Sequence, residues 1–467
     1  MLLLVGQMVG FGLSFLRNLI LARILTKADF GLAAALSLTM SLLELVSRMS
    51  FGLQIIQAPE GDDPIFQAVA HSAQMAVGVI SAVLVLVGAY PFAIAFSVPN
   101  LTWAFVSLAI VPLTRGAMHL DMARLQRSYL YGSAVLCDVV PQGLATATAW
   151  PLALWLGDFR VVLWIMLGKE IATVALSHLL ADRQYHCAWQ RTTGIQMLSF
   201  GWPLLLNSFV MFASLQADQI LIGANFSLAD LGSYSIAFTI TSIPFFIFGQ
   251  VGSSLMLPIM ARQEDSVQYE RQYSHCLELS VLGSLFFLGP LVVAGGSIVR
   301  LLYGPKYSGI GWLMTVFGII VALRLFRLAP SVASMARADT INELICNIAR
   351  SASLPIALLV VAIGVNKMEA VAACGLAGEA LAILISSLRI HKRQKINLAV
   401  HIRPLLFLLG WIALGVVMRM WSGCAPPIWV PAVETLVLWC MGAIASFYLF
   451  PEMRSIYRQL FESLSLK

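Results

Sequence analysis

The chain carries Leu25-Thr26-Lys27-Ala28-Asp29-Phe30-Gly31 and, about 200 residues later, the similar stretch Phe226-Ser227-Leu228-Ala229-Asp230-Leu231-Gly232. Each stretch follows one apolar segment of helix length and precedes another. Both contain a hydroxyl residue, a spacer and then Ala-Asp-apolar-Gly, with the same offset throughout. Such a repeat predicts a fold built from two copies of one large unit, a construction common among membrane transporters.

The composition indicates a membrane protein. Apolar residues make up 59% of the 467 residues, charged residues only 11%, and the mean hydropathy is +0.86. A soluble domain of this size would need a more polar surface. The 29 Lys and Arg exceed the 23 Asp and Glu, but they are scattered between apolar runs, so we expect no nucleic-acid partner. The seven cysteines show no metal-ligand spacing, and we expect neither a metal site nor a cofactor.

Apolar segments of about 20 residues, enough to cross a bilayer core of about 30 Å, recur along the chain. Marking them off between charged or turn-like breaks predicts an all-α integral membrane protein with about 14 transmembrane helices. The expected spans cover residues 2–25, 30–50, 66–90, 101–121, 129–156, 159–181, 196–222, 231–257, 273–299, 308–330, 340–363, 368–389, 402–421 and 428–450.

The basic residues between the spans predict their direction. Alternate loops and the C-terminus carry fifteen Lys and Arg residues, whereas the other loops carry five, namely Lys27, Arg160, Lys306, Lys367 and Arg419. The richer set should be cytoplasmic, which places both termini inside. The first segment is too long for a cleavable signal peptide, and because Met1 falls directly within it, a natural start upstream of Met1 stays open.

The two repeat stretches lie six spans apart, an even number, so both copies should run in the same direction through the membrane. This predicts two parallel six-helix lobes, with a substrate path between them, followed by two C-terminal helices. The expected boundaries are an N-lobe over residues 1–181, a cytoplasmic linker over 182–195, a C-lobe over 196–389, and the last two helices with a cytoplasmic tail over 390–467.

Two transporter superfamilies have parallel repeats. The major facilitator superfamily usually has basic residues between helices 2 and 3, but the segment Gln57–Pro64 has none. By contrast, the run Leu21-Ala22-Arg23-Ile24-Leu25-Thr26-Lys27-Ala28-Asp29-Phe30-Gly31 resembles the signature after helix 1 of Wzx-type polysaccharide or O-antigen flippases. These form a branch of the multidrug/oligosaccharidyl-lipid/polysaccharide exporter superfamily. Further similar stretches are 51–57, 218–223, 231–237, 257–262 and 302–307, so the resemblance covers roughly residues 15–310.

The resemblance implies an alternating-access flippase of the bacterial inner membrane. Its substrate would be an undecaprenyl-diphosphate-linked oligosaccharide, moved to the periplasmic leaflet for O-antigen, capsule or exopolysaccharide synthesis. Other implied partners are membrane lipids, H⁺ or Na⁺ as coupling ion, and polymerase and chain-length proteins of the same pathway. No bond-making chemistry is expected, so the chain should not be an enzyme.

Three other functions were weighed. A cation-coupled drug exporter is disfavoured because basic residues inside the spans would repel cationic drugs, and the motif after helix 1 disfavours a lipid II flippase. A polysaccharide polymerase should have a large periplasmic loop with catalytic Arg or His, and no such loop separates the expected spans.

Basic residues inside spans are the candidates for contact with the substrate's diphosphate, because a charge in the bilayer costs about 3 kcal/mol or more on insertion scales. Arg17, Lys169 and Arg350 lie deepest and could face the cavity or form structural ion pairs. Closer to helix ends are Arg23, Arg48, Arg324 and Arg327, which we expect to extend to the interface.

Four carboxylates inside spans are candidates for ion coupling: Asp138, Glu170, Asp218 and Glu379. A carboxylate in a low-dielectric cavity can bind a proton or Na⁺ at one stage of transport.

Several pairings can be predicted for these charges. Asp218 occupies the repeat position equivalent to Arg17, and the two could face each other across the axis between the lobes as opposite charges or could pair directly. Glu44 with Arg48, and Glu343 with Arg350, share helix faces, whereas the adjacent Lys169 and Glu170 should not meet.

Two further expectations concern the repeat turns and the histidines. Each Asp of the repeat stretches is expected to cap the helix opened by its Gly. His71 and His119 should be packed or solvated rather than part of a proton path.

Overall fold

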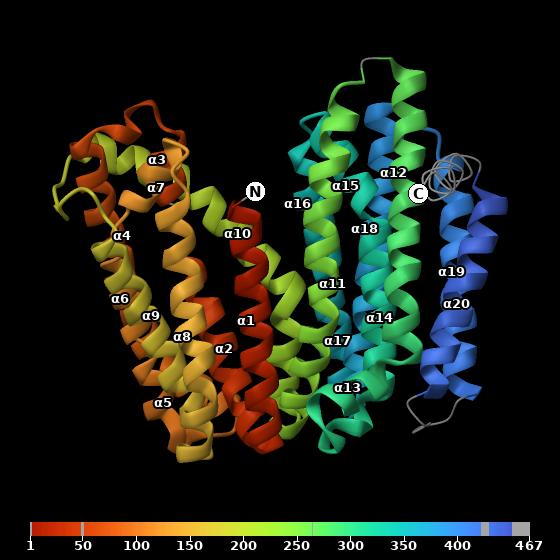
Figure 1. Cartoon of the computed structure of the whole chain (residues 1–467), viewed down its shortest axis with the longest axis horizontal. Coiled ribbons are helices and arrows are strands. Elements are labelled where there is room, and N and C mark those ends of the chain that lie inside the picture. Colours follow the sequence, from red (N-terminus) through yellow and green to blue (C-terminus); the bar gives the residue numbers. More distant parts are fainter. Residues whose placement is uncertain (1, 48–50, 264, 422–428, 451–467) are drawn as a thin grey trace, which may run out of the picture. The chain divides into compact units, whose positions relative to one another are not determined.

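The computed structural model describes residues 2–47, 51–263, 265–421 and 429–450, and these contain helices and no strand (Figure 1). In chain order the α-helices are α1 (Leu2–Ile24), α2 (Lys27–Ser47), α3 (Phe51–Gln57), α4 (Pro64–Ala95), α5 (Thr102–Ser107), α6 (Ile110–Gly116), α7 (Asp121–Arg127), α8 (Gly132–Leu156), α9 (Arg160–Leu179), α10 (Arg191–Asn225), α11 (Leu228–Ala261), α12 (Ser266–Leu288), α13 (Gly295–Tyr303), α14 (Gly311–Phe326), α15 (Leu328–Ala336), α16 (Thr340–Ser351), α17 (Ser353–Ala362), α18 (Met368–Gln394), α19 (Ala399–Trp421) and α20 (Trp429–Leu449). Short 3-10 turns are η1 (Pro59–Asp62), η2 (Pro99–Leu101) and η4 (Pro305–Ile310), and η3 (Gly289–Val293) is a π-helix.

The all-α membrane fold predicted from the sequence is confirmed. In the described residues, eleven helical segments are long and apolar enough to cross a membrane, and the bent pair Pro99–Gly116 and Asp121–Arg127 can add a twelfth. Helices α2 and α8 coincide with the two remaining predicted spans. The fourth span is not continuous as predicted, because it breaks into α5 and α6 and then bends by 48° before α7.

Contacts divide the chain into two compact units, Met1–Gly232 (unit 1) and Ser233–Lys467 (unit 2). In unit 1, α1 packs along α8, α8 along α9, α4 along α5 and α6, and α10 against α2 and α4. One apolar core of unit 1 lies where α3 and α7 meet the start of α4, around Phe51, Ile55, Phe66 and Leu120. This division by contacts does not test the lobe boundaries expected from the repeat, which stay a prediction.

The two repeat turns have the same capping arrangement. Helix α2 begins at Lys27, and the hydroxyl of Thr26 accepts a hydrogen bond from the N–H of Asp29 at 3.1 Å. Helix α11 begins at Leu228, and Ser227 Oγ accepts from the N–H of Asp230 at 3.1 Å. The expectation that each Asp is the cap is wrong: the hydroxyl residue is the N-cap. Asp29 and Asp230 instead occupy the third helical position and accept bonds from Thr26 and Ser227.

The two turns also lie against each other within unit 1. A Cβ added to Gly31 would lie 1.7 Å from the carbonyl oxygen of Leu228, and one added to Gly232 would lie 2.7 Å from the carbonyl oxygen of Lys27. A side chain at either position would therefore collide with backbone. The glycines of both turns are required because the helix starts cross at backbone contact.

Unit 2 has an extensive apolar core. The end of α11 packs with α12, α14, α15, α18 and α19 around the buried side chains of Tyr269, Tyr273, Phe326 and Leu408. Helices α16 and α17 pack along α18, and α20 packs along η3. Helices α14 and α18 contribute to this core, and together with α16 they carry Arg324, Glu343, Arg350 and Glu379.

Candidate functional site

Arg17 on α1 is bound by neutral side chains. Its Nη1 donates to Gln142 Oε1 of α8 at 3.1 Å, and its Nη2 donates to Ser14 Oγ at 3.2 Å. Among the described residues no carboxylate forms an ion pair with it, so of the two alternatives for Arg17 and Asp218 the direct pair is not observed. The guanidinium therefore has no carboxylate counter-ion among the described residues.

Two of the candidate carboxylates also lie in unit 1. Asp138 lies one turn before Gln142 on α8, is exposed, and forms no hydrogen bond or ion pair with another described residue. Asp218 is half-buried on α10, and its Oδ1 accepts from the N–H of Gln219 at 2.9 Å. Asp138 is therefore near the face of α8 that holds Arg17.

A row of alternating charges crosses α2, α6 and α9. Glu44 Oε1 lies 2.8 Å from Arg115 Nη1, and Arg115 Nε lies 3.6 Å from Glu170 Oε2. Glu170 Oε1 lies 3.2 Å from Lys169 Nζ, so the prediction that these neighbours do not meet is wrong. The long, flexible lysine stem allows the contact. Glu44 has Arg115 as partner, and the expected partner Arg48 lies outside the described residues.

In unit 2, Glu379 of α18 is fully buried between two arginines. Its Oε1 lies 2.5 Å from Arg324 Nε of α14 and 3.7 Å from Arg350 Nη1 of α16. Arg350 also donates from Nη2 to Asn347 Oδ1 at 3.0 Å, and its side chain is only 6% exposed. The pairing of Glu343 with Arg350 is thus wrong, because the counter-ion of Arg350 is Glu379.

Glu343 of α16 faces Arg327 instead. Both terminal nitrogens of Arg327 lie 3.2 Å from the Glu343 carboxylate, which also accepts a 2.6 Å hydrogen bond from Ser331. The expectation that Arg324 and Arg327 extend to the interface is wrong, since both are ion-paired and their side chains are 12% and 7% exposed. Three arginines and two carboxylates leave this cluster with one excess positive charge.

The break between α6 and α7 is held by polar side chains of α4 and α9. His71 Nε2 accepts from the N–H of Leu120 at 3.0 Å, so its Nδ1 carries the proton and donates to the His186 carbonyl at 3.0 Å. Gln74 donates to the carbonyl of Met118 at 2.9 Å, and Ser177 Oγ accepts from the N–H of His119 at 3.0 Å. The imidazole of His119 accepts from the N–H of Asp121 at 3.1 Å, and both histidines are buried, which agrees with the expectation that they are packed.

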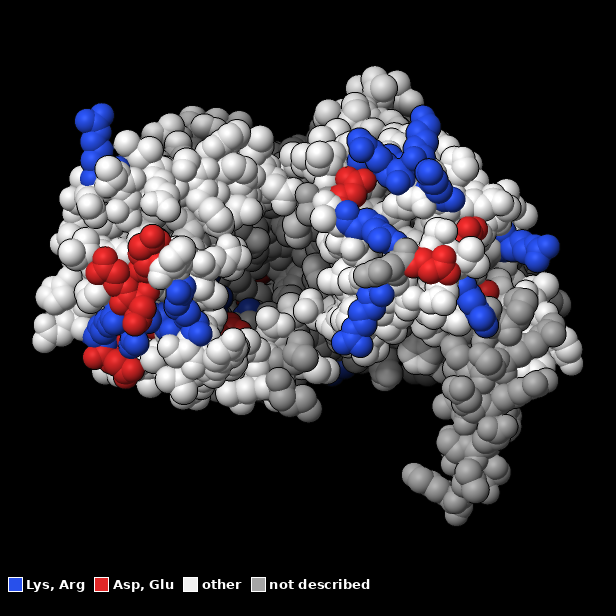
Figure 2. Space-filling view, turned by 90° about the horizontal axis from the view of Figure 1, so that it is seen from above, with Lys and Arg blue, Asp and Glu red and all other residues white. Residues whose placement is uncertain are grey.

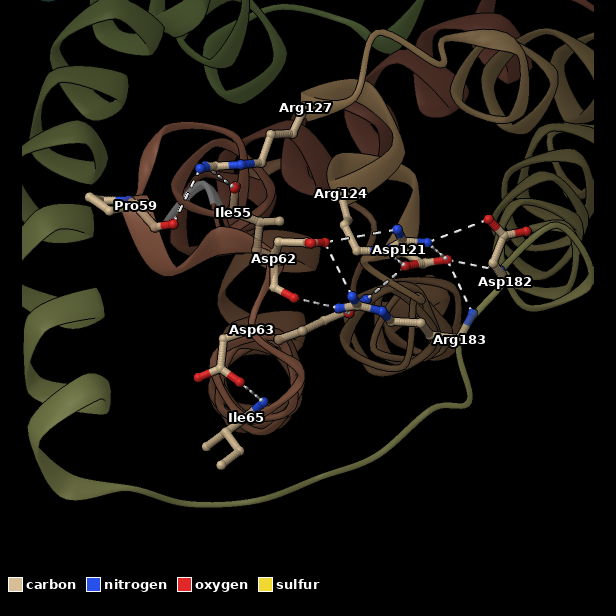
Figure 3. A network of polar contacts seen from close by, with 11 residues as sticks. Ile55, Pro59, Asp62, Asp63, Ile65, Asp121, Arg124, Arg127, Asp182 and Arg183 are labelled. Atoms are coloured by element: carbon tan, nitrogen blue, oxygen red, sulfur yellow. Dashed lines mark hydrogen bonds and ion pairs between the residues drawn. The ribbon is translucent and has the colours of Figure 1, made fainter.

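Charged side chains also fix one end of unit 1 (Figure 3). Asp121 Oδ2 accepts from the backbone N–H groups of Asp182 at 2.8 Å and Arg183 at 3.3 Å, while Arg124 donates to Oδ1 at 2.5 Å. Arg183 in turn donates to Asp62 Oδ1 at 3.1 Å, and Arg127 donates to the carbonyls after α3. This network joins the α3–α4 corner, α7 and the segment after α9.

Arg115, Gln142 and Ser14 were not predicted from the sequence. Arg115 lies near the end of its apolar segment, where an arginine is unremarkable. Gln142 could have been noticed, since a polar amide in the middle of the apolar run 132–156 needs a partner.

Residues 20–311, more than half of the chain, match the family described as "Polysaccharide biosynthesis protein". The chain belongs to this family. It is 25% identical over 294 residues to the succinoglycan biosynthesis transport protein ExoT of Rhizobium meliloti (strain 1021), covering 60% of this chain and 56% of that protein. It is 22% identical over 340 residues to the lipopolysaccharide biosynthesis protein WzxC of Escherichia coli (strain K12), covering 68% and 65%. The matches span less than two thirds of both relatives.

Solved transporter structures share the fold. Lipid II flippase MurJ in an inward closed conformation matches with a TM-score of 0.74 at 10% identity. The match covers 95% of the present chain and 98% of the MurJ chain. An inward-facing multidrug resistance MATE transporter of the MOP superfamily matches with a TM-score of 0.65 at 12% identity, covering 83% and 94%. The polysaccharide biosynthesis family expected from the sequence is therefore confirmed, and the solved structures show that the chain has the fold of these transporters.

Proposed function

We propose that this protein is a flippase that carries an undecaprenyl-diphosphate-linked oligosaccharide across the bacterial inner membrane by alternating access. The product would supply O-antigen, capsule or exopolysaccharide synthesis. In this proposal both termini are cytoplasmic, the N-lobe and C-lobe follow the repeat boundaries, and no covalent bond is made or broken. Polymerase and chain-length proteins would act on the product after translocation.

Arg17 is the observation that carries the proposal. An arginine inside an apolar helix is costly, and neutral partners such as Gln142 and Ser14 do not cancel its charge. A guanidinium can bind two phosphate oxygens at once, and Gln142 and Ser14 hold it in place for such a ligand. Lys169, whose side chain is 32% exposed, could add a second contact, whereas Arg350 is occupied by Glu379.

Asp138 is the stronger candidate for ion coupling among the four carboxylates. Glu170 and Glu379 already have cationic partners, so protonation would leave buried positive charge behind. Asp138 is exposed on α8 beside the Arg17 region and forms no ion pair with another described residue, so a coupling ion would break no salt bridge there. Substrate diphosphate at Arg17 and a proton at Asp138 would then be linked electrostatically. Asp218 stays the second choice.

The test is replacement of Arg17 in a strain whose chromosomal copy is deleted. We expect the deletion to trap intact lipid-linked repeat units in the cytoplasmic leaflet, and the plasmid-borne protein to restore polymer. Arg17→Gln should restore less than about a tenth of the polymer, and Arg17→Lys an intermediate amount, because Lys supplies charge but not a planar bidentate donor. Membrane levels of each variant are measured in parallel.

Arg160→Gln is the matched control, because Arg160 pairs with Asp158 at the exposed start of α9. It should restore polymer fully. Normal polymer output from Arg17→Gln would remove Arg17 from the substrate path. Unpolymerised repeat units on the periplasmic side of the deletion strain would overturn the flippase function itself.

A further inference from the structure

A pocket of about 550 Å³ lies at one end of unit 2, where two chain segments meet. The loop between α15 and α16 and the start of α16 form one wall, and the end of α18 forms the other. The lining residues are Arg337, Ala338, Asp339, Ile341, Arg393, Gln394 and Lys395. Lys and Arg side chains predominate over acidic ones on this end of unit 2 (Figure 2).

The pocket has an uncompensated positive charge. Its acidic residue, Asp339, accepts two hydrogen bonds of 3.1 Å from Arg389 and is thereby neutralised. Arg337, Arg393 and Lys395 remain, and within the described part of the chain none of them forms an ion pair with a carboxylate. Three cations thus line one water-accessible hollow.

Contacts beneath the pocket hold its walls in place. Arg337 donates to the carbonyl of Gln263 at 3.0 Å, and its guanidinium carbon lies 4.2 Å from the centre of the Tyr269 ring. Gln394 accepts a hydrogen bond from the Tyr269 hydroxyl at 3.0 Å and donates to the carbonyl of Ala333 at 3.1 Å. The pocket is therefore built on the buried core of unit 2.

The backbone on both walls adopts an unusual conformation. Ala338 has φ 55° and Lys395 has φ 60°, two of the four non-glycine residues with positive φ in the described chain. Non-glycine residues in this left-handed region are disfavoured, and such residues concentrate at functional sites. Both conformations occur where a helix ends: Arg337, the C-cap of α15, precedes Ala338, and Lys395 is the C-cap of α18. Both cations line the same hollow.

We propose that this pocket binds the phosphate group of a lipid at the membrane surface. Arginine matches phosphate oxygens with paired donors, and basic residues at the ends of membrane helices attract anionic head groups. The phosphate could belong to an anionic phospholipid or to the diphosphate of a lipid-linked oligosaccharide. The second source rests on the proposed function and would make the pocket a first capture point for the substrate.

Binding to the purified full chain in phosphatidylcholine nanodiscs tests the proposal with two probes, phosphatidylglycerol and undecaprenyl diphosphate. The pocket variant combines Arg337→Gln, Arg393→Gln and Lys395→Gln. The control variant removes three exposed cations elsewhere in unit 2, with Arg262→Gln, Lys392→Gln and Arg403→Gln. Thermal unfolding of both is recorded, and the double variant Arg393→Gln with Lys395→Gln keeps the Arg337 contacts in case the triple variant unfolds.

The pocket variant should weaken binding of at least one probe by about a hundredfold, and the double variant by about 25-fold, since each cation near an anionic surface strengthens binding about fivefold. Loss of phosphatidylglycerol alone assigns a phospholipid site, and loss of undecaprenyl diphosphate assigns a substrate site. Equal weakening in the control variant, or no weakening in the pocket variant, overturns the proposal. If the pocket variant bound both probes normally but lost transport, the pocket proposal would be overturned, and the transport result would concern only the proposed function.

Discussion

Arg17 in unit 1 and Arg350 in unit 2 are both arginines inside apolar helices, yet their surroundings differ. Arg17 is held by an amide and a hydroxyl. Arg350 lies 3.7 Å from a fully buried carboxylate, Glu379, which it shares with Arg324. The same residue type therefore provides an uncompensated charge in one unit and part of a structural ion cluster in the other.

The difference shows that depth alone does not identify a binding residue in a membrane protein. A buried ion pair removes charge from the site, and breaking it is destabilising because one partner stays buried without compensation. An arginine with neutral partners has the opposite property: removing it relieves a cost. Replacing the arginine should thus lower stability in unit 2 and leave it nearly unchanged in unit 1.

The largest effect on stability is expected from Glu379→Gln. The change leaves three buried arginines facing one carboxylate, Glu343, and should destabilise the protein by about 3–5 kcal/mol. This loss of stability is measured by the abundance of the variant in membranes and by thermal unfolding of the purified protein. Glu369→Gln, at the half-buried start of the same helix, is the control and should behave like the unmodified protein. Equal unfolding temperatures for both variants would contradict the cluster's structural role.

A smaller loss is expected from Glu170→Gln in unit 1. Arg115 keeps Glu44 at 2.8 Å, and Lys169 can extend into water, so the cost should be about 1–3 kcal/mol. Thermal unfolding is again the measurement, with Lys169→Gln as the matched variant at under about 1 kcal/mol. If Glu170→Gln lowered the unfolding temperature as much as Glu379→Gln, the ion pairs of the two units would contribute equally to stability, contrary to this comparison.

Arg17→Leu should change stability by less than about 1 kcal/mol, because the lost hydrogen bonds are offset by removal of a charge from an apolar helix. Arg350→Leu should lower stability, since Glu379 loses one of its two cations. Transport should fall in both, but only the second loss should be accompanied by a lower unfolding temperature. Strong destabilisation by Arg17→Leu would show that Arg17 is structural too.

The smallest effect is expected from Ser14→Ala, which removes one of the two neutral partners of Arg17. A slightly less ordered guanidinium should slow the initial rate of repeat-unit translocation about twofold, equivalent to about 0.5 kcal/mol. Gln142→Leu, which removes the partner from α8, should have a larger effect. If both variants translocated repeat units at the rate of the unmodified protein, the orientation of Arg17 would not limit transport.

Much of the fold followed from the sequence. Long apolar runs separated by charged breaks mark helices unambiguously, because a bilayer admits few alternatives. Helices α1, α9 and α20 begin and end within two residues of the predicted limits. The break before α7 was missed because its polar support comes from His71 and Gln74, which lie far away in the sequence.

The charges inside the helices were identified only in part, since Arg115 was missed, and their pairings were mostly not predictable. Spacing along one helix suggested Glu343 with Arg350 and Glu44 with Arg48, whereas the observed partners come from other helices. Those partners, Glu379 and Arg115, depend on how helices pack, and periodicity within one segment does not contain that information. The hydrogen bond from Arg17 to Gln142 was unpredictable for the same reason, since it joins α1 to α8.

The crossing of Gly31 and Gly232 has a consequence for how this chain could have diverged after duplication. At this crossing each turn is the other's neighbour, so a mutation that adds a side chain to one copy collides with the backbone of the other. The similarity between the two stretches is retained at these few residues because each turn limits which side chains the other can carry.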